Sequence, residues 1–244
     1  MEITIERFSK GAAMARGIAV IIDVFRAYSV EAYVFSRGAE RIYPIADLEE
    51  AYAFKRAHPE YLLAGERSAR MPEGFDFGNS PAQLECAELT GKTLIHTTSA
   101  GTQGVVAAKN ADRILVGALV NAQATVEYIR TLGAKRVSLV CMGYENRLPA
   151  AEDEACAEYI RSLLLGTPYD LKAAVARLKE SETSGKRFFI PENQSFAPER
   201  DFTLCTRNDI FPFAMEIRRD HDGRAYAECV QPKTGMQYTG EREE

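Results

Sequence analysis

Strand-like and helix-like segments alternate along residues 18 to about 165, and this alternation limits the folds open to the chain. The run 18–22 is apolar without polar alternation, as expected for a strand covered on both faces. Repeated strand–helix units of this kind predict an α/β fold, a mainly parallel sheet flanked by helices. We expect strands near 2–5, 18–22, 41–45, 61–64, 93–97, 113–120 and 136–142, and helices over about 27–37, 47–57, 121–132, 151–165 and 167–180, with further helices starting near 80 and 102.

The C-terminal third is less regular. We expect an α/β domain over 1–166 that carries most of the site, and a helical and irregular portion over 167–244 that packs on it or continues the same domain. Residues 181–186 read as a surface linker, 225–230 as an antiparallel strand and 239–244 as a polar tail, while the segment after the first strand reads as a loop.

Composition narrows the function classes. The chain has 244 residues, which is long enough to bury a hydrophobic core. Its net charge of −5 gives no excess of positive charge with which to bind nucleic acid. No apolar run reaches the roughly 18–20 residues of a membrane span, and the opening MEITIERFSK lacks a secretory signal. Five widely spaced cysteines without C-x-x-C fit reduced thiols. We therefore expect a cytoplasmic protein without nucleic-acid or membrane partners.

The stretch KTLIHTTSAGTQG, residues 92–104, reads as a strand that turns through small, hydroxyl-rich residues into a helix. Such a turn leaves backbone N–H groups pointing one way at a helix start, which favours an anion. We expect Thr98, Ser99, Gly101 and Thr102 to bind an anionic group. The alternative is that these residues only cap the helix and form the turn.

Ligands in parallel sheets gather outside the carboxyl ends of the strands. Asp23 and Arg26 directly follow the apolar strand 18–22. A carboxylate there is costly to desolvate unless it meets a cation or metal, so Asp23 is the strongest candidate for chemistry. The alternative is an ion pair with Arg26 that tethers the loop.

Other strand ends offer further candidates. Glu66 is a candidate general acid or base, or else an ion-pair partner of a nearby arginine, and Arg67 could clamp an oxyanion. The long loop 65–79 has no periodicity, which favours a functional loop, and its Asn79 is either a ligand or a turn former. Asn121 follows the strand 113–120.

Three acids, Glu152 to Glu154, open the helix that follows the strand 136–142. Acids in a first helical turn often serve only the helix dipole. Three together at a strand end could also supply oxygen ligands to Mg²⁺. Both interpretations stay open from these residues alone.

Several common catalytic motifs are absent. The triplet Gly91-Lys92-Thr93 lacks the earlier glycine of a P-loop and precedes a strand, and no G-x-G-x-x-G or G-x-S-x-G occurs. Asp23-Val24-Phe25 lacks the second aspartate of a haloacid-dehalogenase-type phosphatase.

Taken together, a set of segments in consistent order resembles the 2-phosphosulfolactate phosphatase family. The matching pieces are DVFRA at 23–27, GER at 65–67, GFDFGNSP at 74–81, TTSAGT at 97–102, ALVNA at 118–122, EDEAC at 152–156 and, more weakly, DFTLC at 201–205 with Asp209. The resemblance implies an α/β phosphatase that uses Mg²⁺ to hydrolyse 2-phospho-3-sulfolactate to sulfolactate, a step towards coenzyme M. A homodimer is a further expectation of the resemblance. Tyr28 departs from it, since similar sequences usually carry Ser or Thr there.

We therefore expect loops along one rim of the sheet to converge on a pocket for a multiply negative small molecule and Mg²⁺. Asp23, Arg26 and Glu66 are the expected catalytic residues, with either Asp23 or a metal-bound water as nucleophile. The expected metal ligands are Asp23, Glu152 and Asp153, and the expected substrate-binding residues are Arg67, Asn79, Thr98, Ser99, Gly101, Thr102 and Asn121. Two alternatives remain: a non-catalytic protein that binds an anionic metabolite, and a phosphatase for a different phosphorylated three-carbon acid.

Overall fold

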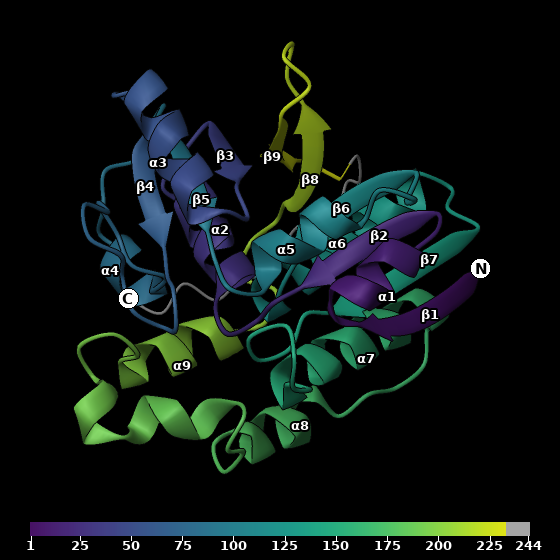
Figure 1. The fold of residues 1–244 in the computed structure, drawn as a ribbon. Helices are drawn as coiled ribbons and strands as arrows, with labels where there is room; N and C mark the ends of the chain where they lie inside the picture. The colour runs from purple at the N-terminus through teal and green to yellow at the C-terminus, as the bar shows by residue number, and fades with distance from the viewer. Residues whose placement is uncertain (233–244) are drawn as a thin grey trace.

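The computed structural model describes residues 1–232 and shows a nine-stranded sheet with helices packed around it (Figure 1). The polar tail expected at 239–244 lies outside the described residues. The strands are Glu2–Arg7 (β1), Ile18–Ile22 (β2), Arg41–Pro44 (β3), Leu62–Gly65 (β4), Thr93–Thr97 (β5), Arg113–Gly117 (β6), Arg136–Cys141 (β7), Ala214–Arg219 (β8) and Ala225–Val230 (β9). The α-helices are Phe8–Met14 (α1), Ala27–Ser36 (α2), Leu48–Ala57 (α3), Pro81–Leu84 (α4), Gly101–Ala107 (α5), Ala122–Thr131 (α6), Ala151–Leu165 (α7), Leu171–Leu178 (α8) and Glu199–Thr206 (α9).

The strand order is β1-β7-β2-β6-β8-β9-β3-β5-β4. The predicted α/β fold with a mainly parallel sheet is confirmed, since β1, β7, β2 and β6 form one parallel block and β3, β5 and β4 another. Every residue of β2 is buried, as its unbroken apolar run predicts for a strand covered on both faces.

The antiparallel hairpin β8–β9 lies between the two blocks. The pairings β6–β8, β8–β9 and β9–β3 are all antiparallel, so the second block runs opposite to the first. In a flat sheet the carboxyl ends of the two blocks would lie at opposite edges. The sheet twists across the hairpin instead (Figure 1). The segments that follow β2, β7, β4 and β5 line one pocket.

Two local expectations differ from the structure. The segment after β1 is the helix α1 and not a loop, because its Gly11 and Ala12 are small enough to pack closely on the sheet. The expected surface linker 181–186 contains the buried Ser184 and Gly185, since this segment passes beneath the site. The hairpin strand β9 joins the centre of the main sheet, so the C-terminal portion is part of that sheet.

Candidate active site

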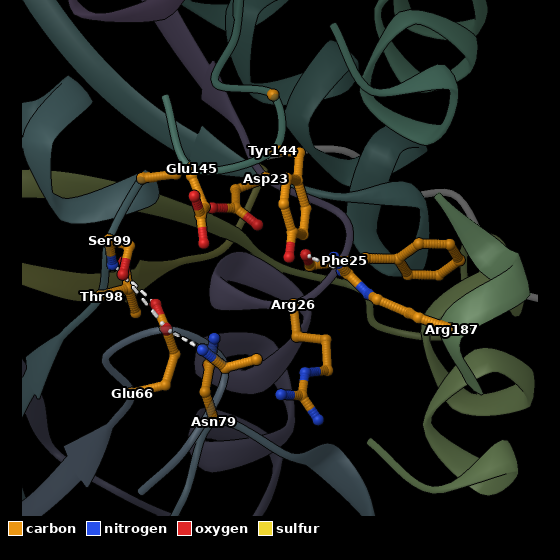
Figure 2. A pocket seen from close by; sticks show the side chains of 13 residues that line it. Asp23, Phe25, Arg26, Glu66, Asn79, Thr98, Ser99, Tyr144, Glu145 and Arg187 are labelled. Atoms are coloured by element: carbon orange, nitrogen blue, oxygen red, sulfur yellow. Dashed lines mark hydrogen bonds between the residues drawn. The ribbon is translucent and has the colours of Figure 1, made fainter. Parts of the chain in front are cut away.

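A pocket lies where the strand ends meet (Figure 2). Its lining comes from the segments after β2, β4, β5 and β7, together with the stretch Gly185–Phe189 (η2) beneath the sheet. The lining residues are Asp23, Phe25, Arg26, Glu66, Ala69, Asn79, Thr98, Ser99, Ala100, Gly143, Tyr144, Glu145 and Arg187.

Asp23 lies in this pocket with 6% of its surface exposed. Its Oδ1 accepts a hydrogen bond from the backbone N–H of Ala27 at 3.1 Å, because α2 begins directly after the strand-end turn. Burial raises the pKa of Asp23 to about 6, against the lowering effect of that N–H and of the Arg187 charge. The carboxylate is therefore a poorly solvated group beside a cation, which suits a nucleophile or a metal ligand.

Two arginines bring positive charge to the pocket. Arg26 is 4% exposed and forms an ion pair with the buried Asp201, 2.7 Å between Nη1 and Oδ2. The expected alternative of an Asp23–Arg26 ion pair is not formed. Arg187 donates from Nη2 to the carbonyl oxygen of Phe25 at 2.8 Å, and its guanidinium lies 5.2 Å from the ring centroid of Tyr144. These contacts hold both guanidinium groups beside the space where an anion would lie.

Glu66 accepts hydrogen bonds from the loop after β5. Its Oε1 accepts from the Ser99 N–H at 2.6 Å, and its Oε2 accepts from the Ser99 hydroxyl at 3.2 Å and the Ala69 N–H at 2.8 Å (Figure 2). At the predicted anion-binding turn, the Ser99 N–H and hydroxyl therefore already donate to a carboxylate of the protein itself. Since all three partners donate to it, Glu66 is held as a hydrogen-bond acceptor at the pocket wall.

A buried polar chain holds Asn79. The Oδ1 of Asn79 lies 3.3 Å from His96 Nε2, and His96 Nδ1 lies 2.8 Å from Glu31 Oε1. Glu31 and His96 are each 1% exposed, whereas Asn79 lines the pocket. The strand residue His96 therefore supports a pocket residue from behind.

The two acids at the start of α7 differ in their surroundings. Both oxygens of Asp153 accept backbone N–H bonds, from Val24 and Gly143 at 2.8 Å each, so this carboxylate ties the β2 and β7 strand ends together. Burial raises its pKa well above the usual range. Glu152 is 2% exposed, its Oε2 has no hydrogen-bond partner within residues 1–232, and burial raises its pKa to about 7 despite the nearby Arg187 charge.

The donor set allows a test of the Mg²⁺ expectation. Within the described part of the chain, no group of three or more His, Cys, Asp or Glu is close enough to hold a metal by itself. Mg²⁺ usually keeps several waters and binds through one or two carboxylates plus substrate phosphate. Of the three predicted ligands, Asp23 lines the pocket, whereas Glu152 and Asp153 lie outside its lining. Both Asp153 oxygens accept backbone N–H groups, so the buried Asp23 and the unpartnered Glu152 oxygen are the carboxylates that fit this mode.

A family model described as 2-phosphosulpholactate phosphatase matches residues 3–220 of this chain. The chain belongs to this family. A probable 2-phosphosulfolactate phosphatase of Bacillus subtilis is 32% identical over 205 residues, which cover 83% of this chain and 88% of the relative. Proteins with the same name from Caldicellulosiruptor saccharolyticus and Thermotoga petrophila are 40% and 32% identical, over 60% and 79% of this chain and 62% and 86% of their own lengths.

The 2-phosphosulpholactate phosphatase family is a family of phosphoric monoester hydrolases, as its name states. The structure brings six of the predicted site residues of this member into the pocket lining: Asp23, Arg26, Glu66, Asn79, Thr98 and Ser99. No helix within residues 1–232 is both long and apolar enough to cross a membrane.

Four predicted substrate-binding residues do not line the pocket of this phosphatase-family protein. The Arg67 guanidinium donates to the Glu66 and Ala46 carbonyl oxygens and to the Thr97 hydroxyl, so it braces β4 against β5. Thr102 exchanges hydrogen bonds with Thr98 and is fully buried. Hydrogen bonds that involve backbone groups fix the positions of Arg67 and Thr102. A prediction based only on which residues follow a strand does not take these bonds into account.

The other two lie behind the lining. The carbonyl oxygen of Gly101 accepts from the Tyr28 hydroxyl at 2.7 Å. The Asn121 side chain accepts from the Ala118 N–H and donates to the Phe213 carbonyl, because the segment 209–213 that leads into β8 lies along residues 119–121. Asn121 therefore stabilises the fold near the hairpin and lies outside the pocket.

The structure adds pocket residues that sequence reasoning missed. Tyr144 and Glu145 follow β7, so the same strand-end rule could have found them. Arg187 had no local signal, because it lies in an irregular segment between two helices and reaches the pocket only through the tertiary fold.

Proposed function

We propose that this protein is a Mg²⁺-dependent phosphatase that hydrolyses 2-phospho-3-sulfolactate, or a similar small phosphorylated acid, to sulfolactate and phosphate. One observation carries the proposal: a buried carboxylate, Asp23, lines the same pocket as the two arginines Arg26 and Arg187. The family and the printed names of its relatives support the substrate.

The charges of the pocket match that substrate class. Phosphosulfolactate carries a phosphate, a sulfonate and a carboxylate on three carbons, so several donors must lie close together. Arg26 and Arg187 supply charge-assisted donors, and Asn79 and Thr98 supply polar groups from the opposite wall (Figure 2). Each charge-assisted bond is worth roughly 1.5–3 kcal/mol when shielded from water.

The chain's own residues have distinct roles in the reaction. The arginines orient the phosphoryl group and stabilise the charge that develops on its oxygens. Glu66, held as an acceptor by Ser99 and Ala69, can take a proton from an attacking water. When water attacks phosphorus, the bond between phosphorus and the substrate C2 oxygen breaks, and that oxygen takes up the proton that Glu66 removed from the water. When Asp23 attacks instead, the same bond breaks, the C2 oxygen takes its proton from solvent, and a water activated by Glu66 then hydrolyses the aspartyl phosphate to release phosphate.

Mg²⁺ would be held by Asp23 and Glu152, with Asp153 fixing the two strand ends beside them. When bound, the ion neutralises phosphate charge and activates a water. Uncatalysed phosphate monoester hydrolysis is so slow that catalysis must lower the barrier by on the order of 20 kcal/mol.

The test is phosphate release from a panel of phosphorylated three-carbon acids, with Mg²⁺ and with EDTA. Turnover of phosphosulfolactate that EDTA abolishes and Mg²⁺ restores is the expected result. Tight binding without turnover would instead favour a non-catalytic anion-binding protein, and preference for another acid would reassign the substrate. Acid-quenched samples examined for a phosphorylated Asp23 peptide would separate the two nucleophiles.

The cellular setting is part of the same proposal. We place the reaction in the cytoplasm, on a route towards coenzyme M, with a small anionic substrate as the partner and no nucleic acid. The predicted homodimer is checked by light scattering on the purified protein.

A further inference from the structure

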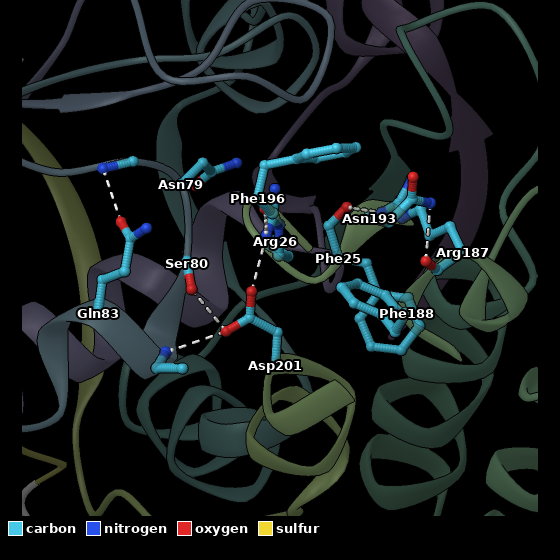
Figure 3. Close-up of polar contacts among 12 residues, drawn as sticks. Phe25, Arg26, Asn79, Ser80, Gln83, Arg187, Phe188, Asn193, Phe196 and Asp201 are labelled. Carbon is cyan, nitrogen blue, oxygen red and sulfur yellow. Dashed lines mark hydrogen bonds and ion pairs between the residues drawn. The ribbon is translucent and has the colours of Figure 1, made fainter. Parts of the chain in front are cut away.

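Asp201 in α9 is fully buried and contacts three donors from two separate parts of the chain (Figure 3). Its Oδ2 lies 2.7 Å from Arg26 Nη1. Its Oδ1 accepts from the Ser80 hydroxyl at 2.8 Å and from the Ala82 N–H at 3.0 Å. One carboxylate thus joins the C-terminal helix α9 to the segment after β2 and to the start of α4.

The contacts of Arg26 leave part of its guanidinium free. Nη1 donates both to Asp201 and to the carbonyl oxygen of Phe196 at 2.6 Å. Within residues 1–232 both hydrogen bonds of Arg26 use Nη1, so Nε and Nη2 keep their protons for a ligand. Since Arg26 also lines the pocket, Asp201 and Phe196 together set the direction in which those donors point.

The same carboxylate also holds the Asn79–Ser80 segment. Asn79 lines the pocket, and Ser80 directly follows it in the chain. Asp201 binds Arg26 through Oδ2 and Ser80 through Oδ1, so it holds both segments at once. A charge buried as deeply as that of Arg26 requires a partner, and Asp201 is its ion-pair partner in the described part of the chain.

We propose that Asp201 is a positioning residue for the phosphatase reaction: without touching the substrate, it holds the Arg26 guanidinium and the Asn79–Ser80 segment at the separation that the phosphorylated acid requires. This inference rests on the proposed function, because Arg26 acts there as an anion-binding group. The other explanation is that Asp201 only anchors α9 to the rest of the protein.

A double-mutant cycle separates the two explanations. Asp201→Asn keeps an oxygen for Ser80 and Ala82 but removes the charge from Arg26. We expect it to lower kcat/KM for phosphosulfolactate about 10- to 100-fold, as a small misplacement of a binding group does. In an Arg26→Gln background the same change should cost less than about twofold, because the positioned group is gone. Equal losses in both backgrounds would assign Asp201 to anchoring alone.

The matched control is Glu199→Gln on the same helix, where the exposed side chain has no contact with the pocket residues. It should leave kcat/KM unchanged. Asp201→Glu, which keeps the negative charge, is the second variant and should retain more activity than Asp201→Asn.

Side-chain NMR of the arginine Nη–H groups tests positioning without activity, because Nη1 is the atom that Asp201 binds. The Arg26 signal is assigned by its loss in Arg26→Lys. We expect it to be shifted and protected from solvent exchange in the wild type and in Asp201→Glu, and to move to the exchange-averaged position in Asp201→Asn. If the wild type turns over no phosphorylated acid, the proposed function fails while this signal still decides the role of Asp201. Two results would overturn the proposal. One is an Arg26 signal that is the same in the wild type and in any folded variant lacking the Asp201 charge. The other is an exchange-averaged Arg26 signal in a folded Asp201→Glu variant.

Discussion

Tyr28 donates its hydroxyl hydrogen to the carbonyl oxygen of Gly101 at 2.7 Å, so the start of α2 is joined to the start of α5. The ring is fully buried, and burial raises the pKa of Tyr28 well above its usual value, which keeps the hydroxyl a donor. This large side chain therefore fills the space between the two strand-end turns of the site and joins them.

Tyr28→Phe removes only that hydrogen bond and leaves a buried carbonyl without its donor. We expect a loss of about 1–3 kcal/mol in the free energy of unfolding. Tyr28→Ser adds a cavity, and we expect a larger loss of roughly 3–5 kcal/mol. Urea denaturation of both variants measures these values, and a Phe variant as stable as the wild type would show that the bond contributes nothing.

Asp23→Asn should abolish phosphate release while the protein stays folded, because the amide can neither attack phosphorus nor bind a cation as a carboxylate does. We expect a fall in kcat on the order of 10³-fold. Asp112→Asn, an exposed aspartate at the amino ends of the strands, is the control. Near-normal rates in folded Asp23→Asn would remove this residue from the mechanism.

Arg187→Gln should weaken substrate binding more than it slows turnover, since the guanidinium meets charge present in both substrate and transition state. Loss of one shielded charge-assisted bond predicts a KM roughly 10- to 100-fold higher. Steady-state kinetics measure KM and kcat of Arg187→Gln. The control is Arg177→Gln, which changes an exposed arginine of α8. An unchanged KM would place Arg187 outside the substrate contacts.

Gly101→Ala tests how closely α5 approaches Asp23. An added Cβ would lie 2.8 Å from the Ala27 Cβ and 3.0 Å from Asp23 Oδ2, so the carboxylate or the helix must shift. We expect kcat to fall by at least about tenfold, as small misplacements at a catalytic group do. Gly117→Ala, where a Cβ meets nothing closer than 3.6 Å, should change kcat little. Equal activity of the two variants would contradict the close packing.

Glu152 makes stability depend on pH in the metal-free protein. Burial raises its pKa from 4.5 to about 7, so the folded form holds the proton more tightly than the unfolded chain does. The contribution of Glu152 to the free energy of unfolding is fully present below about pH 4.5 and is lost as the pH rises through 7. The free energy of unfolding changes by on the order of 3 kcal/mol over this range. In EDTA, Glu152→Gln should therefore gain stability relative to the wild type between pH 5 and 8. The exposed Glu192→Gln is the control, and parallel stability profiles for the wild type and Glu152→Gln would contradict the shift.

The alternating pattern after residue 18 predicted the succession of strands and helices and a mainly parallel sheet. The polar residues at strand ends predicted Asp23, Arg26, Glu66 and Ser99 at the site, and all four line the pocket. These features are local: an apolar run predicts a covered strand, and the residue after it must lie at the carboxyl end. The same rule also predicted Asn121 at the site, but it does not show that the segment leading into β8 lies along residues 119–121 and holds Asn121 outside the pocket lining.

Only the tertiary structure decided which ends meet. The antiparallel hairpin reverses the second block, and the twist of the sheet brings the loops after β4 and β5 against those after β2 and β7. It also brought Arg187, from the segment Gly185–Phe189, into the pocket lining and set Asp201, from α9, against Arg26. Contacts between residues over 150 positions apart depend on packing and buried charge pairing, which no short stretch of sequence records.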